Sequence, residues 1–240
     1  MKVKISLHLH SNEDPQDGPA IKYSIYELID RAAALGFKVL ASTAHAQSVC
    51  RPEHIKYAGK KGILLISGVE VEMENHGHML ILNGGKQADQ VASFRQLKIF
   101  KKQHPESFII APHPNHGMGS SIGLKELLRL KGTVDAVEYS WYYSKLLNPN
   151  SGTREICKKM DLPLIATCDA HVLDYLNTDY AVVNLNRLTI EAVFVAIRKG
   201  KFINVTRPKK IRELLEFMLY LALNDFMALL KSGGGKKKAD

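Results

Sequence analysis

The sequence predicts an α/β fold in which a mostly parallel sheet has helices packed outside it. Short apolar segments typical of buried strands alternate with longer segments whose apolar residues recur at helical spacing. The 240-residue chain is 45% hydrophobic, which is enough for one domain with a complete core. The number of strand-like segments suits a barrel of about seven or eight strands, by analogy with the (β/α) barrel.

The first predicted helix shows the signals that delimit these elements. Ser24 stands as its N-cap, Glu27 follows three residues later as in a capping box, and Gly36 comes after the last helical residue. Apolar runs predict strands at Val3–Leu9, Val39–Thr43, Ile63–Val71, His78–Leu82, Phe108–Ala111, Val134–Tyr139, Leu164–Cys168 and Phe202–Val205. Helical periodicity predicts helices at Ser24–Leu35, Gln87–His104, Leu124–Leu130, Thr153–Met160 and Thr189–Arg198.

The C-terminal part of the chain differs from this alternating region. Residues 209–231 form one long helical pattern that is apolar on more than one face, which is typical of a packed helix. We expect this helix to pack against the barrel or against a second subunit of a homo-oligomer. The predicted organisation is a barrel over residues 1–208, this helix over 209–231, and a disordered Gly- and Lys-rich tail over 232–240.

Charge and cysteine content restrict the class of protein. A formal net charge of +9 favours anionic partners such as phosphorylated small molecules, nucleic acid or a membrane surface. The three cysteines are far apart, which argues against a disulfide framework or a zinc finger and favours a reducing compartment. We find neither a signal peptide nor a segment apolar enough to be transmembrane. We therefore expect a cytoplasmic protein.

Histidines and carboxylates follow the predicted strands where each strand ends. His8 and His10 are two residues apart and so share one face of a strand, and Asp169 and His171 repeat this spacing. Either pair alone can arise by chance, but in a barrel all such strand ends meet at one rim. The candidate metal ligands are His8, His10, Asp17, His45, Glu70, His78, His113, Asp169 and His171.

The chemistry of this set predicts a cluster of divalent ions. It contains imidazole and carboxylate donors and no thiolate, which suits Zn, Mn or Fe better than a structural zinc site. Nine ligands exceed what one ion needs, and a carboxylate such as Glu70 can bridge two ions. The sequence therefore predicts a metal-dependent hydrolase.

These motifs resemble those of the PHP (polymerase and histidinol phosphatase) family of metal-dependent phosphoesterases. The resemblance extends from Lys2 to about Val205, and it rests on LHLHS followed by DG, STAH, SGVEVE with a later His, APHP and TCDAH. It implies a distorted (β/α)7 barrel with up to three metal ions at its rim.

The resemblance also implies how the ligands divide and which chemistry follows. One site would use His8, His10, Glu70 and Asp169, a second Asp17, His45 and His171, and a third Glu70, His78 and His113. Two or three divalent ions (Zn, Mn or Fe) would share a metal-bound hydroxide as nucleophile, so no protein nucleophile is required.

Three positions depart from the family pattern. Ser6 and Ala44 stand where the family often has Asp, and Cys168 stands where it usually has a small polar residue. Ala44 lacks a carboxylate that could orient His45. None of the three changes removes an expected metal ligand, so an active enzyme remains the first interpretation.

Three functions are compatible with this chemistry. The first is a hydrolase acting on phosphoric ester bonds of a small phosphorylated substrate, a phosphomonoester. The second is a 3′-5′ exonuclease or other phosphodiesterase acting on nucleic acid, and the third is a non-catalytic, metal-stabilised binding protein. The chain lacks a basic stripe with interleaved aromatic residues, which favours small substrates.

Substrate contacts are expected from the loops near the rim. A phosphate needs cationic or hydrogen-bonding partners, and the candidates in or near these loops are Lys22, Arg51, His116 and Arg207. The aromatic residues Trp141 to Tyr143 follow a predicted strand and either stack on a ring of the substrate or line the rim.

Overall fold

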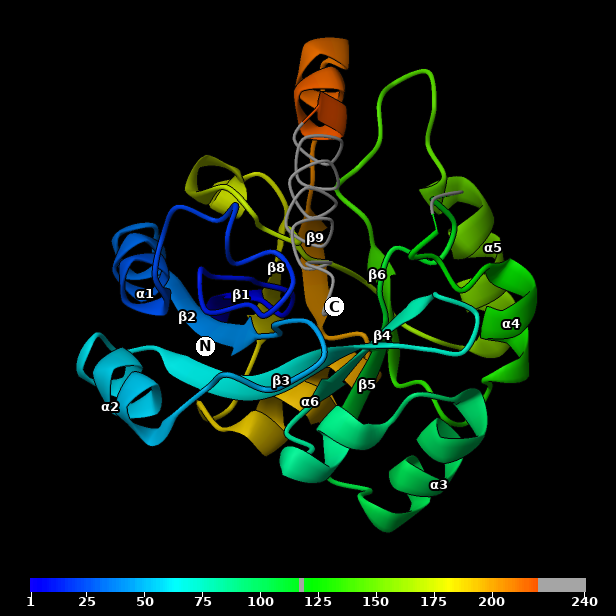
Figure 1. The fold of residues 1–240 in the computed structure, drawn as a ribbon, viewed down its shortest axis with the longest axis horizontal. Helices are drawn as coiled ribbons and strands as arrows, with labels where there is room; N and C mark the ends of the chain where they lie inside the picture. Colours follow the sequence, from blue (N-terminus) through cyan, green and yellow to red (C-terminus); the bar gives the residue numbers. More distant parts are fainter. Residues whose placement is uncertain (117–118, 220–240) are drawn as a thin grey trace, which may run out of the picture.

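In the described part of the chain, nine strands form one sheet that curls into a nearly closed barrel (Figure 1). The computed structural model describes residues 1–116 and 119–219. The order across the sheet is β7-β6-β5-β4-β3-β2-β1-β8-β9. The strands are β1 (Lys2–Ser6), β2 (Phe37–Ser42), β3 (Leu64–Glu72), β4 (His78–Leu82), β5 (Phe108–Ala111), β6 (Ala136–Tyr139), β7 (Leu164–Ala166), β8 (Tyr180–Asn184) and β9 (Phe202–Val205).

Most strands run in the same direction, so their carboxyl ends form one rim. The pairs β1–β2, β2–β3, β5–β6 and β6–β7 are parallel. Strand β4 is antiparallel to both β3 and β5, and β8 is antiparallel to both β1 and β9. Only these two strands of the described part are therefore reversed, and the start of β4 lies at the same rim as the end of β3.

A side chain joins the two edges of the sheet. Asn204 of β9 donates its Nδ2 to the carbonyl of Leu164 at 2.7 Å, and its Oδ1 accepts the backbone N–H of Ala166 at 2.8 Å. The amide of Asn204 thus takes the place of a backbone peptide group between β7 and β9.

Among the described residues, helices α1 to α5 cover the outside of the barrel, and α6 closes the end opposite the rim. Figure 1 shows α1 and α2 on one side and α4 and α5 on the other. The helices are α1 (Ile25–Ala34), α2 (Pro52–Lys60), α3 (Phe94–Gln103), α4 (Leu124–Arg129), α5 (Asn150–Met160) and α6 (Ile190–Arg198), with short 3₁₀ helices η1 (Lys86–Gln90) and η2 (Leu173–Asn177).

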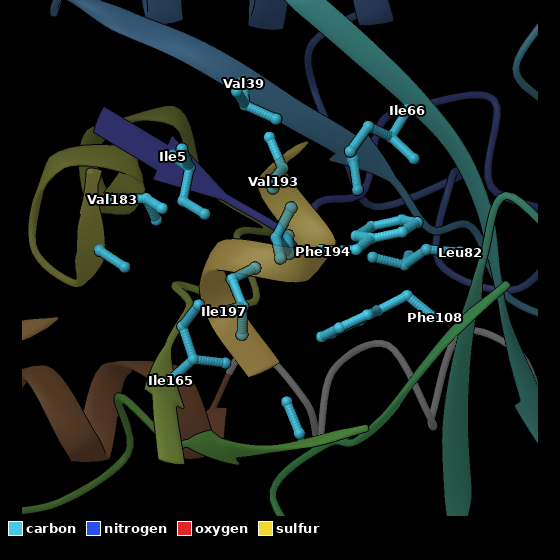
Figure 2. Packing of buried hydrophobic residues seen from close by; sticks show 14 of the residues in the cluster. Ile5, Val39, Ile66, Leu82, Phe108, Ile165, Val183, Val193, Phe194 and Ile197 are labelled. Carbon is cyan, nitrogen blue, oxygen red and sulfur yellow. The ribbon is translucent and has the colours of Figure 1, made fainter. Parts of the chain in front are cut away.

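Helix α6 packs its apolar face against the inner side of the strands, while Glu191, Val195 and Arg198 on its other face are exposed. Its Val193, Phe194 and Ile197 are buried in one cluster with inward-facing residues of the strands. Figure 2 shows them surrounded by side chains such as Ile66 of β3 and Phe108 of β5. The rings of Phe108 and Phe194 stack with centroids 4.6 Å apart. This apolar filling leaves the rim as the place where polar side chains can gather.

The structure confirms the predicted barrel and corrects some of its elements. The capping box at Ser24 and Glu27 is present. Helix α2 and strand β8 were not predicted, and the helix expected over Gln87–His104 is two elements, η1 and α3, because Ser93 caps α3. All helices were expected outside the sheet, which is wrong for α6.

The C-terminal prediction is described only in part. Residues 211–219 are helical, whereas the remainder of the predicted helix and the expected disordered tail lie outside the described residues. No described helix has both the length and the apolar character needed to span a membrane.

Candidate metal centre

The sheet geometry brings the predicted ligands to one rim. Ile66 and Glu70 are four residues apart on β3, so they share a face, with Ile66 in the interior core and Glu70 at the rim. His78 is the first residue of β4 and pairs with Glu72 of antiparallel β3, which places it at the same rim. Backbone bridges between Leu9 and Ala170 and between His45 and Glu70 bring the remaining strand ends close.

Glu70 is the centre of the cluster. The carboxylate is buried, and its Oε2 lies 2.8 Å from Nε2 of His8, while its Oε1 lies 2.8 Å from Nδ1 of His78. Both oxygens together lie within 3.4 Å of a ring nitrogen from five residues: His8, His10, His45, His78 and His113. One carboxylate with two oxygens facing different histidines is suited to bridge two cations.

Asp169 approaches the same histidines from the segment after β7. Its Oδ1 lies 3.3 Å from Nε2 of His8, 3.2 Å from Nε2 of His10 and 3.6 Å from Nδ1 of His171. The φ angles of Asp169 (44°) and His113 (26°) are positive, a conformation that non-glycine residues rarely adopt. Such strained backbone is maintained at ligand sites by the surrounding structure.

All nine predicted ligands therefore lie around one centre. His8, His10 and Glu70 form one set of converging donor atoms. Glu70 and His78 converge with His45, whereas His113 converges with His8 and Asp169. Asp17 accepts a hydrogen bond from Nε2 of His171 at 2.9 Å. The division of these ligands among separate ions stays a prediction.

Sequence reasoning missed Asp14, a buried carboxylate that holds two of the histidines. Its Oδ2 accepts from Nδ1 of His10 at 2.8 Å and from Nδ1 and the backbone N–H of His45 at 3.0 and 2.9 Å. Gly18 keeps this loop tight, because a Cβ there would lie 2.3 Å from the carbonyl oxygen of Asp14. Asp14 thus supplies the carboxylate that Ala44 lacks.

Glu138 was also missed and has the equivalent position behind His8. It is fully buried in β6, and its Oε2 accepts from Nδ1 of His8 at 2.7 Å and from Oγ1 of Thr167 at 2.8 Å. The available signal was a carboxylate inside an apolar strand, two residues after Ala136 on the inward face. With Nδ1 held from behind, the Nε2 atoms of His8 and His10 point toward Glu70 and Asp169.

The charges of the cluster are strongly coupled. Burial alone would lower the pKa of His8, but Asp169, Glu70 and Glu138 outweigh it and raise this pKa well above its usual range. Burial alone would raise the pKa of Glu70, but the neighbouring His8, His45 and His78 lower it well below its usual range. The buried carboxylates are therefore stabilised by positive charge at the histidines or between them, which protons or metal ions can provide.

The donor atoms present fit divalent metal ions. Nδ1 of His113 is buried and has no hydrogen-bond partner within the described part of the chain, and Nε2 of His10 is buried facing the carboxylates of Asp169 and Glu70 at 3.2 and 3.3 Å. Buried polar atoms without partners are costly, and a cation that accepts their lone pairs removes this cost. The imidazole and carboxylate donors match the ligand preferences of Zn, Mn and Fe.

A cavity of about 500 Å³ opens above this cluster. Its described lining consists of Gln16, Asp17, His45, Glu70, His78, His113, His116, Gly119, Ser120, Trp141, Tyr142, Asp169, His171 and Phe217. This described lining contains neither Lys nor Arg.

Of the four candidates for phosphate contact, His116 lines the cavity and the other three do not. Burial, with a smaller effect of His113, lowers the pKa of His116 to about 3, so its ring is neutral near pH 7. Arg51 pairs with Glu13 and Glu53, Arg207 pairs with Glu213, and Lys22 is exposed away from the lining.

Two of the departures from the family pattern contact each other. Sγ of Cys168 lies 3.4 Å from Oγ of Ser6. Burial raises the pKa of the Cys168 thiol to about 12, so the thiol stays protonated near neutral pH and is no nucleophile.

Comparison with known proteins agrees with this arrangement. Residues 6–111 match the model of the PHP domain family. A two-domain protein from Bacteroides vulgatus that contains a predicted PHP-like metal-dependent phosphoesterase is similar with a TM-score of 0.66 and 17% identity, covering 90% of this chain and 68% of that one. No curated protein matches the sequence.

Two further solved structures share the fold. PsfC from Pseudomonas syringae matches with a TM-score of 0.63 and 15% identity, covering 94% of this chain and 99% of that chain. The lesion-specific endonuclease PfuEndoQ from Pyrococcus furiosus matches with a TM-score of 0.59 and 15% identity, covering 91% of this chain and 66% of that chain. These findings confirm the predicted PHP resemblance and barrel, and they agree with the predicted class of phosphoric ester hydrolases.

Proposed function

We propose that this chain, in which residues 6–111 match the PHP domain, is a metal-dependent phosphoesterase that hydrolyses a small phosphomonoester. The observation that supports this most directly is the convergence of nine histidine and carboxylate side chains at the floor of one cavity. Two or three ions of Zn, Mn or Fe bound there would supply an activated water and positive charge for the phosphoryl oxygens.

The protein's own residues prepare this centre. Asp14 and Glu138 each hold Nδ1 of a histidine, which fixes the ring and turns Nε2 toward Glu70 and Asp169, where a cation would bind. Glu70 faces both halves of the cluster and provides the negative charge between them. The neutral ring of His116 can exchange hydrogen bonds with the ester without adding charge.

The distribution of cations favours a small substrate over a polymer. The described lining of the cavity has no Lys or Arg, so a phosphate would be neutralised by the bound ions alone. A groove of about 480 Å³ at the other end of the barrel has five cationic side chains, Lys98, Lys101, Lys102, Arg129 and Lys131. Lys101 shows where this groove lies, because its Nζ donates to Ser107 and Asp135, the residues just before β5 and β6 begin. A nucleic acid attracted by this charge would lie far from the metal centre.

A phosphodiesterase acting on nucleic acid is the second candidate. The structural similarity to the lesion-specific endonuclease PfuEndoQ favours it, as does the net charge of +9. A comparison of a nucleoside monophosphate with a short oligonucleotide across a salt series separates the two functions. A faster, salt-sensitive rate on the oligonucleotide would support the nuclease, because each phosphate contact steepens the salt dependence.

Metal content and phosphate release test the proposal together. We expect the purified protein to bind more than one equivalent of Mn or Zn, and we expect His8→Ala and Asp169→Ala to abolish phosphate release while the protein stays folded. His76→Ala is a matched control, because His76 lies in the turn before His78 and its side chain is exposed and bonded to Glu72. A folded protein that takes up no metal, or near-normal turnover in both variants, contradicts the proposal.

A further inference from the structure

One wall of the cavity is built from aromatic rings. Trp141 and Tyr142 come from the loop after β6, and Phe217 comes from the helical segment 211–219. The ring of Phe217 lies 4.7 Å from that of Trp141, at 80°, and 5.5 Å from that of Tyr142. On the metal side, the ring of His171 lies 6.5 Å from Phe217. The aromatic wall, defined as Trp141, Tyr142 and Phe217, therefore adjoins the metal centre directly.

The aromatic wall is held in place from behind. Trp141 stacks on Tyr175 of η2, with centroids 5.7 Å apart and an interplanar angle of 24°. The Nζ atom of Lys209 lies 5.6 Å from the centroid of the Trp141 ring and forms a fully buried ion pair with Asp179. Breaking such a buried pair is costly, so the chain entering segment 211–219 is firmly anchored.

Two hydrogen bonds to backbone carbonyls connect the C-terminal segment to the loop after β6. The N–H of Lys209 donates to the carbonyl of Tyr143 at 2.8 Å, and the hydroxyl of Tyr142 donates to the carbonyl of Leu214 at 3.5 Å. The rings of the wall are thus positioned before any substrate arrives, which reduces the entropy lost on binding.

The position of this wall determines what part of an ester can contact it. A phosphoryl group at the metal centre places its alcohol part against the neighbouring wall, where the described lining offers aromatic rings and no cation. Flat heterocycles stack favourably on such rings. A cavity of about 500 Å³ falls in the size range of small-molecule sites, roughly 300–1,000 Å³.

We propose, on the basis of the phosphoesterase function above, that the aromatic wall selects nucleoside monophosphates by stacking on the base. Hydrolysis then breaks the P–O bond to the nucleoside, water gives its OH to phosphorus, and its proton goes to the departing alcohol. The wall determines specificity, whereas the histidines and carboxylates of the metal centre serve any phosphomonoester.

The test compares esters with and without a base. Adenosine 5′-monophosphate and ribose 5-phosphate present the same sugar phosphate, so their ratio of kcat/KM with Mn isolates the contribution of the base. We expect the nucleotide to be preferred on the order of tenfold or more, the effect typical of one stacked base. Phe217→Ala and the more conservative Phe217→Leu should reduce this ratio, whereas Met218→Ala, whose side chain is half exposed on the same segment, should not.

Fluorescence gives a second readout that does not depend on turnover. Trp141 is the only tryptophan of the sequence, so quenching of the intrinsic fluorescence reports a base bound at the wall. We expect adenosine monophosphate to quench it and ribose 5-phosphate not to, with weaker quenching in Phe217→Ala. Equal kcat/KM values for the two esters, or an oligonucleotide preferred to both, would overturn the proposal. If neither ester is hydrolysed with any metal but the nucleotide still quenches Trp141, the phosphoesterase function fails and the stacking site stands.

Discussion

The role of Asp14 makes a sharp prediction about metal affinity. Asp14→Asn keeps the shape of the side chain but replaces one carboxylate oxygen with an N–H₂ donor. In the structure, Oδ2 accepts from Nδ1 of both His10 and His45, and Oδ1 accepts the N–H groups of Gln16 and Asp17. An amide nitrogen in the place of Oδ2 would face the two ring nitrogens and could not accept a hydrogen bond from either.

The magnitude follows from the number of ligands affected. Loss of one group that orients a metal ligand typically lowers metal affinity about 10–100-fold. Asp14 orients two histidines, and they hold its own pKa well below the usual range despite the opposing effect of burial. We therefore expect the upper end, about 100-fold weaker metal binding, or about 2.7 kcal/mol.

Competition with a chelator measures this directly on the metal-free protein, with Mn and Zn titrated separately. Glu13→Gln is the matched control, because Glu13 is the neighbouring carboxylate but pairs with Arg51 instead of a predicted ligand. Metal affinity in Asp14→Asn within about threefold of the unmodified protein, a small fraction of the effect expected from such groups, would refute the orienting role.

Three further predictions address the core, the protons and the surface charge. Phe194→Ala should lower the free energy of unfolding by about 3–5 kcal/mol in urea titrations, because the ring is buried inside the barrel against Phe108; a cost below about 1 kcal/mol would contradict the packing of α6 against the inner side of the strands. The metal-free protein should melt at lower temperature as pH rises above 6.5. The pKa of His8 is raised by folding, so its protonation stabilises the fold fully below 6.5, and this stabilisation is lost as pH rises through the higher pKa of the folded state. A melting temperature that stays flat or rises in that range contradicts this prediction. Replacing Lys98, Lys102 and Lys131 together with Ala should weaken salt-sensitive binding of single-stranded DNA and leave nucleotide turnover unchanged, and a large loss of turnover would show that the groove serves the reaction.

The sequence was sufficient to predict which side chains gather at the rim where their position depends on strand geometry alone. His8 and His10 share a face by their spacing, and Asp169 and His171 follow a strand in the same way, so the barrel alone brings them together. Asp14 could not be assigned, because the loop path that turns it back onto His45 depends on Gly18 and on contacts far along the chain.

Secondary structure was missed where polar residues replace the expected apolar ones. Helix α2 buries His54 and Ala58 on its inner face, so it lacks the aliphatic periodicity by which a helix is recognised. The position of α6 against the inner side of the strands was equally hidden, because an apolar face predicts burial without saying on which side of the sheet the helix lies. The aromatic wall joins segments more than 70 residues apart, as the hydrogen bond from Tyr142 to the carbonyl of Leu214 shows, and no local sequence pattern predicts such a contact.

The contact of Asn204 with β7 has a consequence for local unfolding. One side chain carries the hydrogen bonds there, with partners at Leu164 and Ala166, whereas pairs of strands elsewhere in the sheet share backbone ladders. Amide hydrogen exchange is expected to detect opening first at such a weakly connected edge. Asp169 follows β7 directly, while His8 follows β1 on the far side of this seam. Cations bound between Asp169 and His8 would connect the two sides of this seam. Removing them with a chelator should therefore speed amide hydrogen exchange at the seam before it affects the rest of the barrel.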